Sequence, residues 1–556
     1  MYRIILTSVI AFFISVEFCG QKQAFQDEYP NGQIRSKGNY LSGFEDSTWT
    51  YYFESGVIQE ISNYKKGKLH GQVLTFHPNG KLMVEGYFKN DLQDSIQKTF
   101  SADEKLLEEG SFVEGKKSGR WNYFFQSGDT MLVEDHTSDF VRILKSCQSP
   151  QVCSVNNGNG VIQEFFPSGK LRSETPYKNG LPNGLYQEYL STGNIRSAGK
   201  YLDGKKDSTW IENYPTGSKK RIANYVNDVL HGEFSDYHSN GNISTTGNYT
   251  EGKKNGTWAW FLESGQKDME GPFENDLQHG DWTYYYGNGN KHYWGRFDHG
   301  LMEGKWQYQY WKGEKWKEGN YSKGKKEGLW NYWFENGKTL MTGNFKNDLE
   351  EGLWKSWYEN GSPKDEGSYK QGKMSGKWVG YYPNGIKNYE GSWYIAKEKD
   401  VFIDKWADMY KKPDSELNLK QGEVKKGLWS YYSETGKPEK SETYNKGVLN
   451  GPAVTYNAMG KPESKGSYKN GKPDGKWEYF HPHGAPMRTC EYREGKLFGN
   501  SVIYNERGKP IEECNYVNNK RDGLYVRYNE KTGKVMLKQI YKDGKVTEVL
   551  EGKPIP

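Results

Sequence analysis

The sequence has few of the side chains from which ordinary layered cores are built. Only 34% of its 556 residues are hydrophobic, and Leu, Ile and Val are sparse. Low hydrophobicity is also typical of disordered chains, but disordered chains lack aromatic residues. This chain instead has 43 Tyr, 19 Trp, 24 Phe and 66 Gly. The composition therefore argues against a conventional layered domain and indicates a thin sheet that carries aromatic side chains.

The sequence also lacks an excess of charge of one sign. It has 76 Lys+Arg against 71 Asp+Glu, and the two signs are interspersed. A nucleic-acid-binding protein needs a basic stripe, so we expect no nucleic-acid partner. No nucleophile elbow, P-loop, dinucleotide fingerprint or metalloprotease helix occurs in the sequence. We therefore expect no enzyme, no catalytic residue and no cofactor.

Long apolar runs are absent except at the N-terminus. Residues 4–16 are almost wholly apolar after a positive charge at Arg3, and Cys19 follows. A short charged segment, an apolar run and a small residue are typical of an export signal, whereas a spanning helix needs about 20 apolar residues. We predict a signal peptide at 1–20, a periplasmic, cell-surface or secreted mature chain, and no transmembrane segment after signal removal. Glu17 and Phe18 disfavour lipidation of Cys19 but leave it open.

The sequence has a strict internal period. Gly-x-Trp recurs every 24 residues, at Gly256, Gly280, Gly304, Gly328, Gly352 and Gly376. A fixed period of this size indicates a repeat architecture. With the glycine as position 0, the frame extends to about 19 repeats and is interrupted twice. The expected organisation is repeats at 21–128, an insertion at 129–159, ten regular repeats at 160–393, an insertion at 394–420 and C-terminal repeats at 421–556.

Each repeat has the pattern of two strands and two turns. An aromatic strand such as 282–285 is followed by an Asn-Gly turn such as Asn336-Gly337, which favours a two-residue type I′ loop because both residues tolerate positive φ. The second strand ends in Gly-x-Tyr or Gly-x-Phe, and a turn such as Lys323-Gly324 closes the repeat. The spacing predicts an all-β fold, an elongated single-sheet antiparallel β-meander solenoid of about 19 hairpins.

This turn fixes the expected register. The position numbers of two residues that face each other across the hairpin then sum to 17, so Trp282 faces Gly295 and Gly280 faces Phe297. An aromatic ring can cover the glycine opposite it. We predict that the repeat tryptophans are structural, with a stacking platform for sugars or a partner's apolar side chains as the alternative. They are Trp258, Trp282, Trp306, Trp330, Trp354, Trp378, Trp429 and Trp477. The aromatic residue at position 5 is an odd number of residues from the tryptophan at position 2. It therefore lies on the opposite face of the strand unless a bulge intervenes, and the sequence leaves this open.

The cysteines divide into two pairs. Cys147 and Cys153 lie in the first insertion, which we expect to be a loop able to bring them together as a disulfide, since export permits disulfides. Cys490 and Cys514 are 24 residues apart and thus two strands apart. That is about 9.6 Å between backbones, beyond the roughly 7 Å that a disulfide spans. We expect the second pair to be reduced.

Two further features have weaker patterns. In the second insertion Phe402, Trp406, Met409 and Tyr410 have helix-like spacing, which predicts a short helix. Histidines at turn-adjacent positions are better explained by variation among repeats than by metal binding; they include His70, His231, His279 and His299. His481-Pro482-His483 is the best metal candidate, but no Cys or carboxylate lies at useful spacing. We therefore expect no metal site.

The repeat also resembles a known family. The segments 381–385 and 468–477 follow the pattern Tyr-Tyr-x-Asn-Gly-Lys and Gly-x-Tyr-x-x-Gly-Lys-x-x-Gly-x-Trp. This pattern is similar to the MORN repeat, in the variant found in YwqK-like antitoxin proteins of bacteria. The resemblance implies a long sheet of stacked hairpins. It also implies a non-catalytic protein-binding or scaffolding role, with an antitoxin that neutralises a partner toxin or a cell-surface glycan-binding protein as alternatives.

Overall fold

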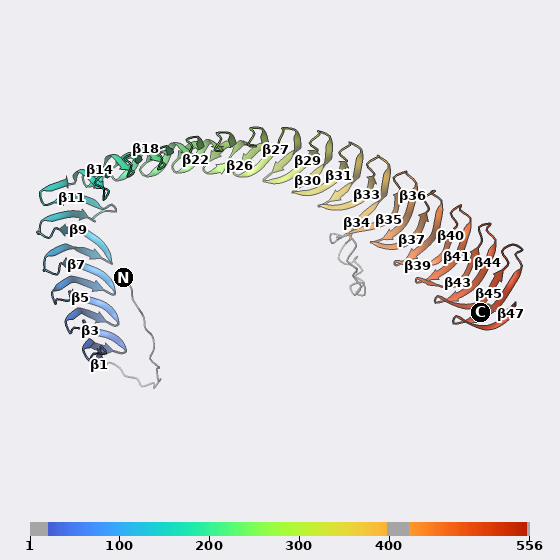
Figure 1. The fold of residues 1–556 in the computed structure, drawn as a ribbon, viewed down its shortest axis with the longest axis horizontal. Helices are drawn as coiled ribbons and strands as arrows, with labels where there is room; N and C mark the ends of the chain where they lie inside the picture. Colours follow the sequence, from blue (N-terminus) through green and yellow to red (C-terminus); the bar gives the residue numbers. More distant parts are fainter. Residues whose placement is uncertain (1–20, 397–421, 553–556) are drawn as a thin grey trace. The chain divides into compact units, whose positions relative to one another are not determined.

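The computed structural model describes residues 21–396 and 422–552 (Figure 1). These residues form 47 β-strands and no helix, and the pairings between strands are antiparallel. By their contacts they divide into two units, Met1–Asn255 with Glu263–Gly265 (unit 1) and Gly256–Leu262 with Gln266–Pro556 (unit 2). The expected all-β antiparallel meander of hairpins is confirmed. The predicted signal peptide at 1–20 lies outside the described residues.

The strands follow one another in chain order within each unit (Figure 1). In unit 1 they are β1 Lys22–Glu28, β2 Ile34–Leu41, β3 Phe44–Tyr52, β4 Ile58–Lys65, β5 Lys68–Phe76, β6 Leu82–Lys89, β7 Leu92–Phe100, β8 Leu106–Val113, β9 Lys116–Phe124, β10 Thr130–Asp135, β11 Arg142–Ser149, β12 Val152–Asn156, β13 Asn159–Phe165, β14 Leu171–Lys178, β15 Leu181–Pro182, β16 Gly184–Tyr189, β17 Ile195–Leu202, β18 Lys205–Asn213, β19 Lys219–Val226, β20 Val229–Tyr237 and β21 Ile243–Thr250. The division between the units falls within β22 Lys253–Phe261.

Unit 2 continues with the strands of the most regular repeats. They are β23 Lys267–Glu274, β24 Leu277–Gln278, β25 Gly280–Tyr285, β26 Lys291–Asp298, β27 Leu301–Gln309, β28 Lys315–Ser322, β29 Lys325–Trp333, β30 Thr339–Lys346, β31 Leu349–Trp357, β32 Pro363–Lys370, β33 Lys373–Tyr381, β34 Lys387–Ile395, β35 Glu423–Tyr432, β36 Pro438–Asn445, β37 Val448–Tyr456, β38 Pro462–Lys469, β39 Lys472–Pro473, β40 Gly475–Phe480, β41 Pro486–Arg493, β42 Lys496–Leu497, β43 Gly499–Tyr504, β44 Pro510–Val517, β45 Lys520–Tyr528, β46 Val535–Lys542 and β47 Lys545–Glu551.

The hairpin of β25 and β26 has the register that the sequence predicts. Gly280 faces Phe297 and Trp282 faces Gly295. Close to the turn the register shifts by one residue, so that Tyr285 faces Lys291. The predicted register is therefore confirmed over most of the hairpin and is wrong beside the turn.

The shift arises because the Asn-Gly turn is not the expected two-residue loop. The Gly289 N–H donates to the Tyr286 carbonyl at 2.9 Å, and the Tyr286 N–H donates to the Asn290 carbonyl at 2.8 Å. Gly289 has a φ of 90°, whereas Asn288 is not among the residues with positive φ. This is a longer loop that ends in a glycine bulge. Asn288 keeps a right-handed conformation, in which its Oδ1 accepts the Asn290 N–H at 3.0 Å.

The type I′ turn occurs instead at the other end of the hairpin. Asp298 pairs with Leu301, which leaves a two-residue loop of His299 and Gly300. Their φ values are 46° and 85°. Positive φ at both central residues defines this turn, and its twist matches that of the flanking strands.

The two faces of the hairpin carry different side chains. Tyr284 stacks on Tyr293 on the face that carries Trp282. The hydroxyl of Tyr285 donates instead to Glu270 at 2.6 Å, on the opposite face. The aromatic residues at positions 2 and 5 therefore lie on opposite faces. We call these the tryptophan face (positions 0, 2 and 4) and the open face (positions 1, 3 and 5).

The two predicted insertions differ in structure. The first is not the expected loop: residues 129–159 contain β10, β11 and β12, which pair in turn and connect β9 to β13. At the second, β34 pairs directly with β35, with Tyr394 facing Val424. The repeats on either side are thus neighbours, and the predicted helix falls in 397–421, outside the described residues.

Candidate functional site

The repeat tryptophans are held by the preceding repeat. A Cβ placed on Gly295 would lie 2.3 Å from Cδ2 of Trp306, so the ring rests directly on that glycine. The Trp306 indole N–H donates to the Arg296 carbonyl at 3.2 Å. Trp282, which faces Gly295 in the register, covers Gly271 instead. The expectation that Trp282 covers Gly295 is therefore wrong, because the shift between β26 and β27 brings Trp306 onto that glycine.

Neighbouring rings complete the enclosure of Trp306. Phe297 meets it edge-on at a centroid distance of 5.0 Å, and Tyr321 does so at 6.1 Å from the other side. Edge-to-face pairs of this kind add about 0.5–1.5 kcal/mol each beyond the area they bury. Around Trp306 the tryptophan face of unit 2 is thus a core of aromatic rings from consecutive repeats.

The exposed fractions place all eight predicted tryptophans inside this core. They are 1% for Trp258 and Trp282, 0% for Trp306 and Trp330, 8% for Trp354, 5% for Trp378, 2% for Trp429 and 6% for Trp477. A sugar ring stacks on an exposed aromatic face, which none of these residues offers. Trp311, by contrast, is 55% exposed.

The open face carries charged pairs and exposed leucines. Lys305 pairs with Glu318 at 3.2 Å, and Lys355 pairs with Glu366 at 3.4 Å. Leucines at position 1 are about half exposed: Leu329 at 50%, Leu353 at 49% and Leu428 at 59%. Burial, and to a lesser extent the hydrogen bond to Glu270, raises the pKa of Tyr285 to about 12. The hydroxyl of Tyr285 therefore stays protonated and acts as a neutral donor. The face is mixed in polarity and exposes apolar side chains at a fixed repeat position.

Side chains at the Asn-Gly turns connect each repeat to the next. The Tyr286 hydroxyl donates to the Gln309 carbonyl at 2.8 Å, and Asn288 Nδ2 donates to the Trp311 carbonyl at 2.9 Å. His481 and His483 occupy the same two positions, with Nε2 at 3.2 and 2.8 Å from the corresponding carbonyls. These two histidines thus replace tyrosine and asparagine in a structural ladder.

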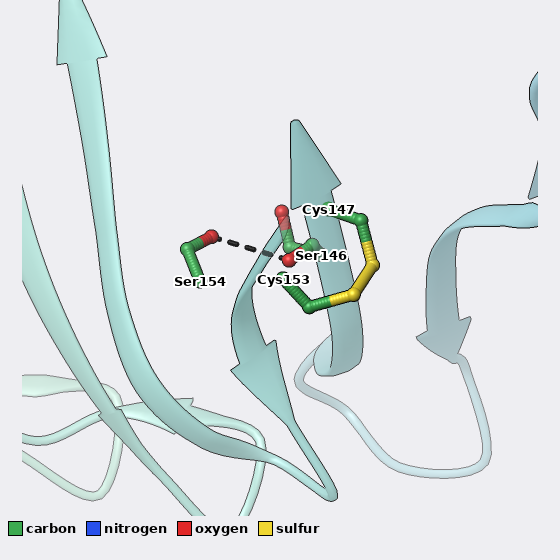
Figure 2. Close-up of a disulfide and its surroundings, with 4 residues drawn as sticks. All are labelled: Ser146, Cys147, Cys153 and Ser154. Carbon is green, nitrogen blue, oxygen red and sulfur yellow. Dashed lines mark hydrogen bonds between the residues drawn. A yellow bond between two sulfur atoms is a disulfide. The ribbon is translucent and has the colours of Figure 1, made fainter. Parts of the chain in front are cut away.

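The cysteines are placed as follows. Cys147 on β11 faces Cys153 on β12 and forms a disulfide with it (Figure 2). Beside it the Ser154 hydroxyl donates to the Ser146 carbonyl at 3.2 Å. The disulfide therefore joins two paired strands, not the ends of a loop.

Cys490 and Cys514 are free, as the register predicts, and both are buried. Burial raises the pKa of both thiols, that of Cys514 to about 11.

A cluster of metal-binding side chains lies at the type I′ turns of unit 2. Ligand atoms of Glu274, His279 and His299 all lie within 4.8 Å of one another. The cluster does not follow from the pattern around any single histidine and was not predicted. The sequence feature that could have revealed the cluster is the spacing of 20 residues between His279 and His299. Residues 20 apart at these turns belong to consecutive repeats and lie next to each other. His231 occupies the same repeat position as His279 and is not part of the cluster.

The comparison with known families supports the repeat assignment. Six segments match the model of the MORN repeat variant: residues 45–66, 69–90, 159–179, 230–251, 326–347 and 350–371. The chain contains MORN repeats. No curated protein matches it. Within 21–396 and 422–552, no helix is long and apolar enough to cross a membrane.

Two of the solved structures that match this chain do so over nearly its whole length. A crystal structure of TcdB2-TccC3-Cdc42 has 9% identity and a TM-score of 0.13, over 96% of this chain and 32% of that one. A Tc holotoxin pore from Photorhabdus luminescens has 9% identity and a TM-score of 0.12, over 96% of this chain and 32% of that one. The chain thus spans about a third of the length of the solved chains that it matches.

Proposed function

We propose that this MORN-repeat chain is an exported, non-catalytic protein that binds a protein partner through the open face of unit 2. The observation that carries the proposal is the difference between the two faces. The tryptophan rings are buried, whereas Leu329, Leu353 and Leu428 are about half exposed on the open face. Contiguous exposed apolar side chains rimmed by polar residues are typical of protein interaction sites, and Leu329 and Leu353 occupy the same position of consecutive repeats.

The polarity of the open face favours a protein over a glycan. Non-obligate protein interfaces mix apolar contacts with polar groups, and here the half-exposed leucines share the face with Lys–Glu pairs such as Lys305–Glu318. A glycan-binding platform would need exposed rings, and the eight repeat tryptophans are at most 8% exposed.

The state of the buried thiols favours a non-catalytic role. A cysteine nucleophile needs an accessible thiolate with a lowered pKa. Cys490 and Cys514 are buried, and burial raises the pKa of both. The histidines at the Asn-Gly turns, His481 and His483, are engaged with backbone carbonyls.

Export rests on the N-terminal pattern at 1–20 and is tested by fractionation. We expect a chain that begins near residue 20 in the exported fraction. Full-length chain confined to the cytosol would contradict export and would favour an intracellular binding role.

Partner binding is tested with matched sets of leucine variants. In one set Leu329, Leu353 and Leu428 are changed to Glu on the open face. In the control set Leu277, Leu301 and Leu349, which are 46–50% exposed beside the type I′ turns, are changed to Glu. In affinity purification from the source cells, we expect the first set to lose a protein that the wild type and the control set retain. Equal recovery by all three would contradict the assignment of the open face.

A further inference from the structure

Consecutive type I′ turns of unit 2 bring histidines and carboxylates of two repeats together. Glu274 ends β23, His279 lies just before β25, and His299 is the first residue of the turn after β26. The Gly300 N–H donates to the Gln278 carbonyl at 2.8 Å, which holds the second turn against the residues around His279. The backbone therefore holds His279 and His299 next to each other, and the centroids of their imidazole rings are 4.8 Å apart.

The imidazole Nε2 atoms converge on one carboxylate. Nε2 of His279 and Nε2 of His299 each lie 3.7 Å from Oε2 of Glu274. Zinc binds His nitrogen and carboxylate oxygen at about 2.0–2.2 Å, so neighbouring ligand atoms around a tetrahedral ion lie roughly 3.4 Å apart. Both separations from the carboxylate are close to that value, and the three ligand atoms all lie within 4.8 Å of one another.

A second carboxylate contacts the other nitrogen of each ring. Asp298 Oδ1 lies 2.7 Å from Nδ1 of His299 and 3.4 Å from Nδ1 of His279. Metal-ligating histidines commonly donate the ring N–H that is not bound to metal to a carboxylate, which orients the ring and selects the tautomer. Asp298 is placed to do this for both rings at once, leaving both Nε2 atoms as ligands.

The ordinary chemistry of the repeat does not explain His279. At the same position of the following repeats, a glutamate accepts a hydrogen bond from the backbone N–H of the residue 20 positions later. Glu303 accepts from Lys323 at 2.7 Å, and Glu327 accepts from Asn347 at 3.0 Å. Among the described residues, Nδ1 of His279 is buried and makes no hydrogen bond, although Asp298 Oδ1 lies 3.4 Å away. The histidine has thus replaced a structural acceptor without taking over its hydrogen bond.

We propose that Glu274, His279 and His299 bind one Zn²⁺ ion, with Asp298 as the positioning residue. Two imidazoles and one carboxylate make a donor set suited to zinc and poor for Mg²⁺ or Ca²⁺, which prefer oxygen ligands. The side chains of Glu274, His279 and His299 are 49%, 32% and 59% exposed, so an ion can enter from solvent and keep a water as its fourth ligand. The bound ion cross-links two consecutive hairpins. This site is independent of the proposed partner-binding face.

The test is a calorimetric titration of ZnCl₂ into the full chain, purified without a histidine tag and in a buffer that does not bind metals. We expect one Zn²⁺ per chain, undiminished by excess Mg²⁺ or Ca²⁺. His279→Ala and His299→Ala should abolish this binding. Asp298→Asn should keep the stoichiometry and weaken the affinity roughly 10- to 100-fold, as loss of an orienting partner does.

The matched control is His231→Ala, which removes a histidine from the same repeat position outside the cluster and should leave binding unchanged. Glu274→Gln serves as a second ligand variant, since a surface amide replaces the carboxylate with little change in shape. Weakened binding in Glu274→Gln together with unchanged binding in His231→Ala supports the site. A wild type that binds no Zn²⁺, or equal losses in His231→Ala and His279→Ala, would overturn it.

Discussion

Two pairs of facing residues in unit 2 fill the same position of the repeat in opposite ways. Gly367 faces Trp378, and a Cβ on the glycine would lie 2.0 Å from the ring. Glu442 faces Ala453 at the equivalent position, where the large and small partners are exchanged. Trp378 and Ala453 are 5% and 6% exposed, so both arrangements close the tryptophan face.

Other repeats fill this position with intermediate side chains. In unit 1 Ser62 faces Val73, and in unit 2 Cys514 faces Tyr525. Ser62 is fully buried at 0% exposure, and Cys514 is 2% exposed. Protein interiors are close-packed, and four different pairs occupy these facing positions with at least one member of each pair buried. The Gly-x-Trp signature is therefore one of several ways to fill a shared space.

The largest expected effect is the loss of a ring. Trp306→Ala should destabilise its repeat by about 3–5 kcal/mol, as truncation of large core aromatics does. Limited proteolysis and hydrogen exchange of the segment around residue 306 measure the effect. Trp311→Ala is the control, since its ring is 55% exposed and its loss should change local stability by less than about 0.5 kcal/mol. Unchanged protease resistance in Trp306→Ala would show that the ring is not part of the core.

A smaller effect is expected from adding a single methyl group beneath a ring. Gly367→Ala should cost about 1–3 kcal/mol, because the new Cβ overlaps Trp378 and the pair must separate. Gly287→Ala is the matched control, since its nearest side-chain atom, on Leu262, is 3.7 Å away. Urea unfolding of both variants distinguishes them, and equal midpoints would refute the close-packing explanation.

Exchanging both members of a pair should restore part of the loss. The double variant Gly367→Ser with Trp378→Val copies the Ser62–Val73 pair of unit 1. We expect it to be more stable than the sum of the two single changes by about 0.5–3 kcal/mol, the usual coupling between residues in contact. A double-mutant cycle in urea measures this coupling. Strictly additive effects would mean that the two positions do not share one space.

The smallest expected effect concerns the buried thiols. Cys490 and Cys514 should resist thiol reagents at neutral pH in the folded chain and react after denaturation. Burial raises the pKa of Cys514 from 9.0 to about 11. The stability that the protonated Cys514 thiol contributes is complete below pH about 9. It is lost as the pH rises towards 11 and the thiol ionises. Thermal unfolding of wild type and Cys514→Ser across this range should converge at high pH. Rapid labelling of the native chain would contradict this burial.

The period and the alternation of strand residues were sufficient to predict the fold. The 24-residue spacing predicted the hairpins, and the position rule predicted that Gly280 faces Phe297. The turn types could not be predicted, because both turns contain glycine after a residue that tolerates positive φ. The side chain of Asn288 distinguishes the Asn-Gly turn, because it makes two hydrogen bonds there while its backbone stays right-handed.

Contacts between repeats were the harder part. The shift between β26 and β27 places Trp306 on Gly295, which pairing within one hairpin does not reveal. The same limit hid the cluster of His279 and His299, whose members belong to different repeats. The residues of 129–159 were expected to form a loop because they leave the 24-residue period. They form strands because strand pairing needs only free backbone N–H and C=O groups and side chains that alternate between the two faces. It does not need the 24-residue repeat.

The central claim is that the repeat tryptophans form the core and leave binding to the open face. Hydroxyl-radical footprinting with mass spectrometry tests it residue by residue on the native chain. We predict strong oxidation of Trp311 and protection of Trp258, Trp282, Trp306, Trp330, Trp354, Trp378, Trp429 and Trp477. Oxidation of these eight at rates comparable to that of Trp311 would contradict the claim, because it would place the rings on an accessible surface.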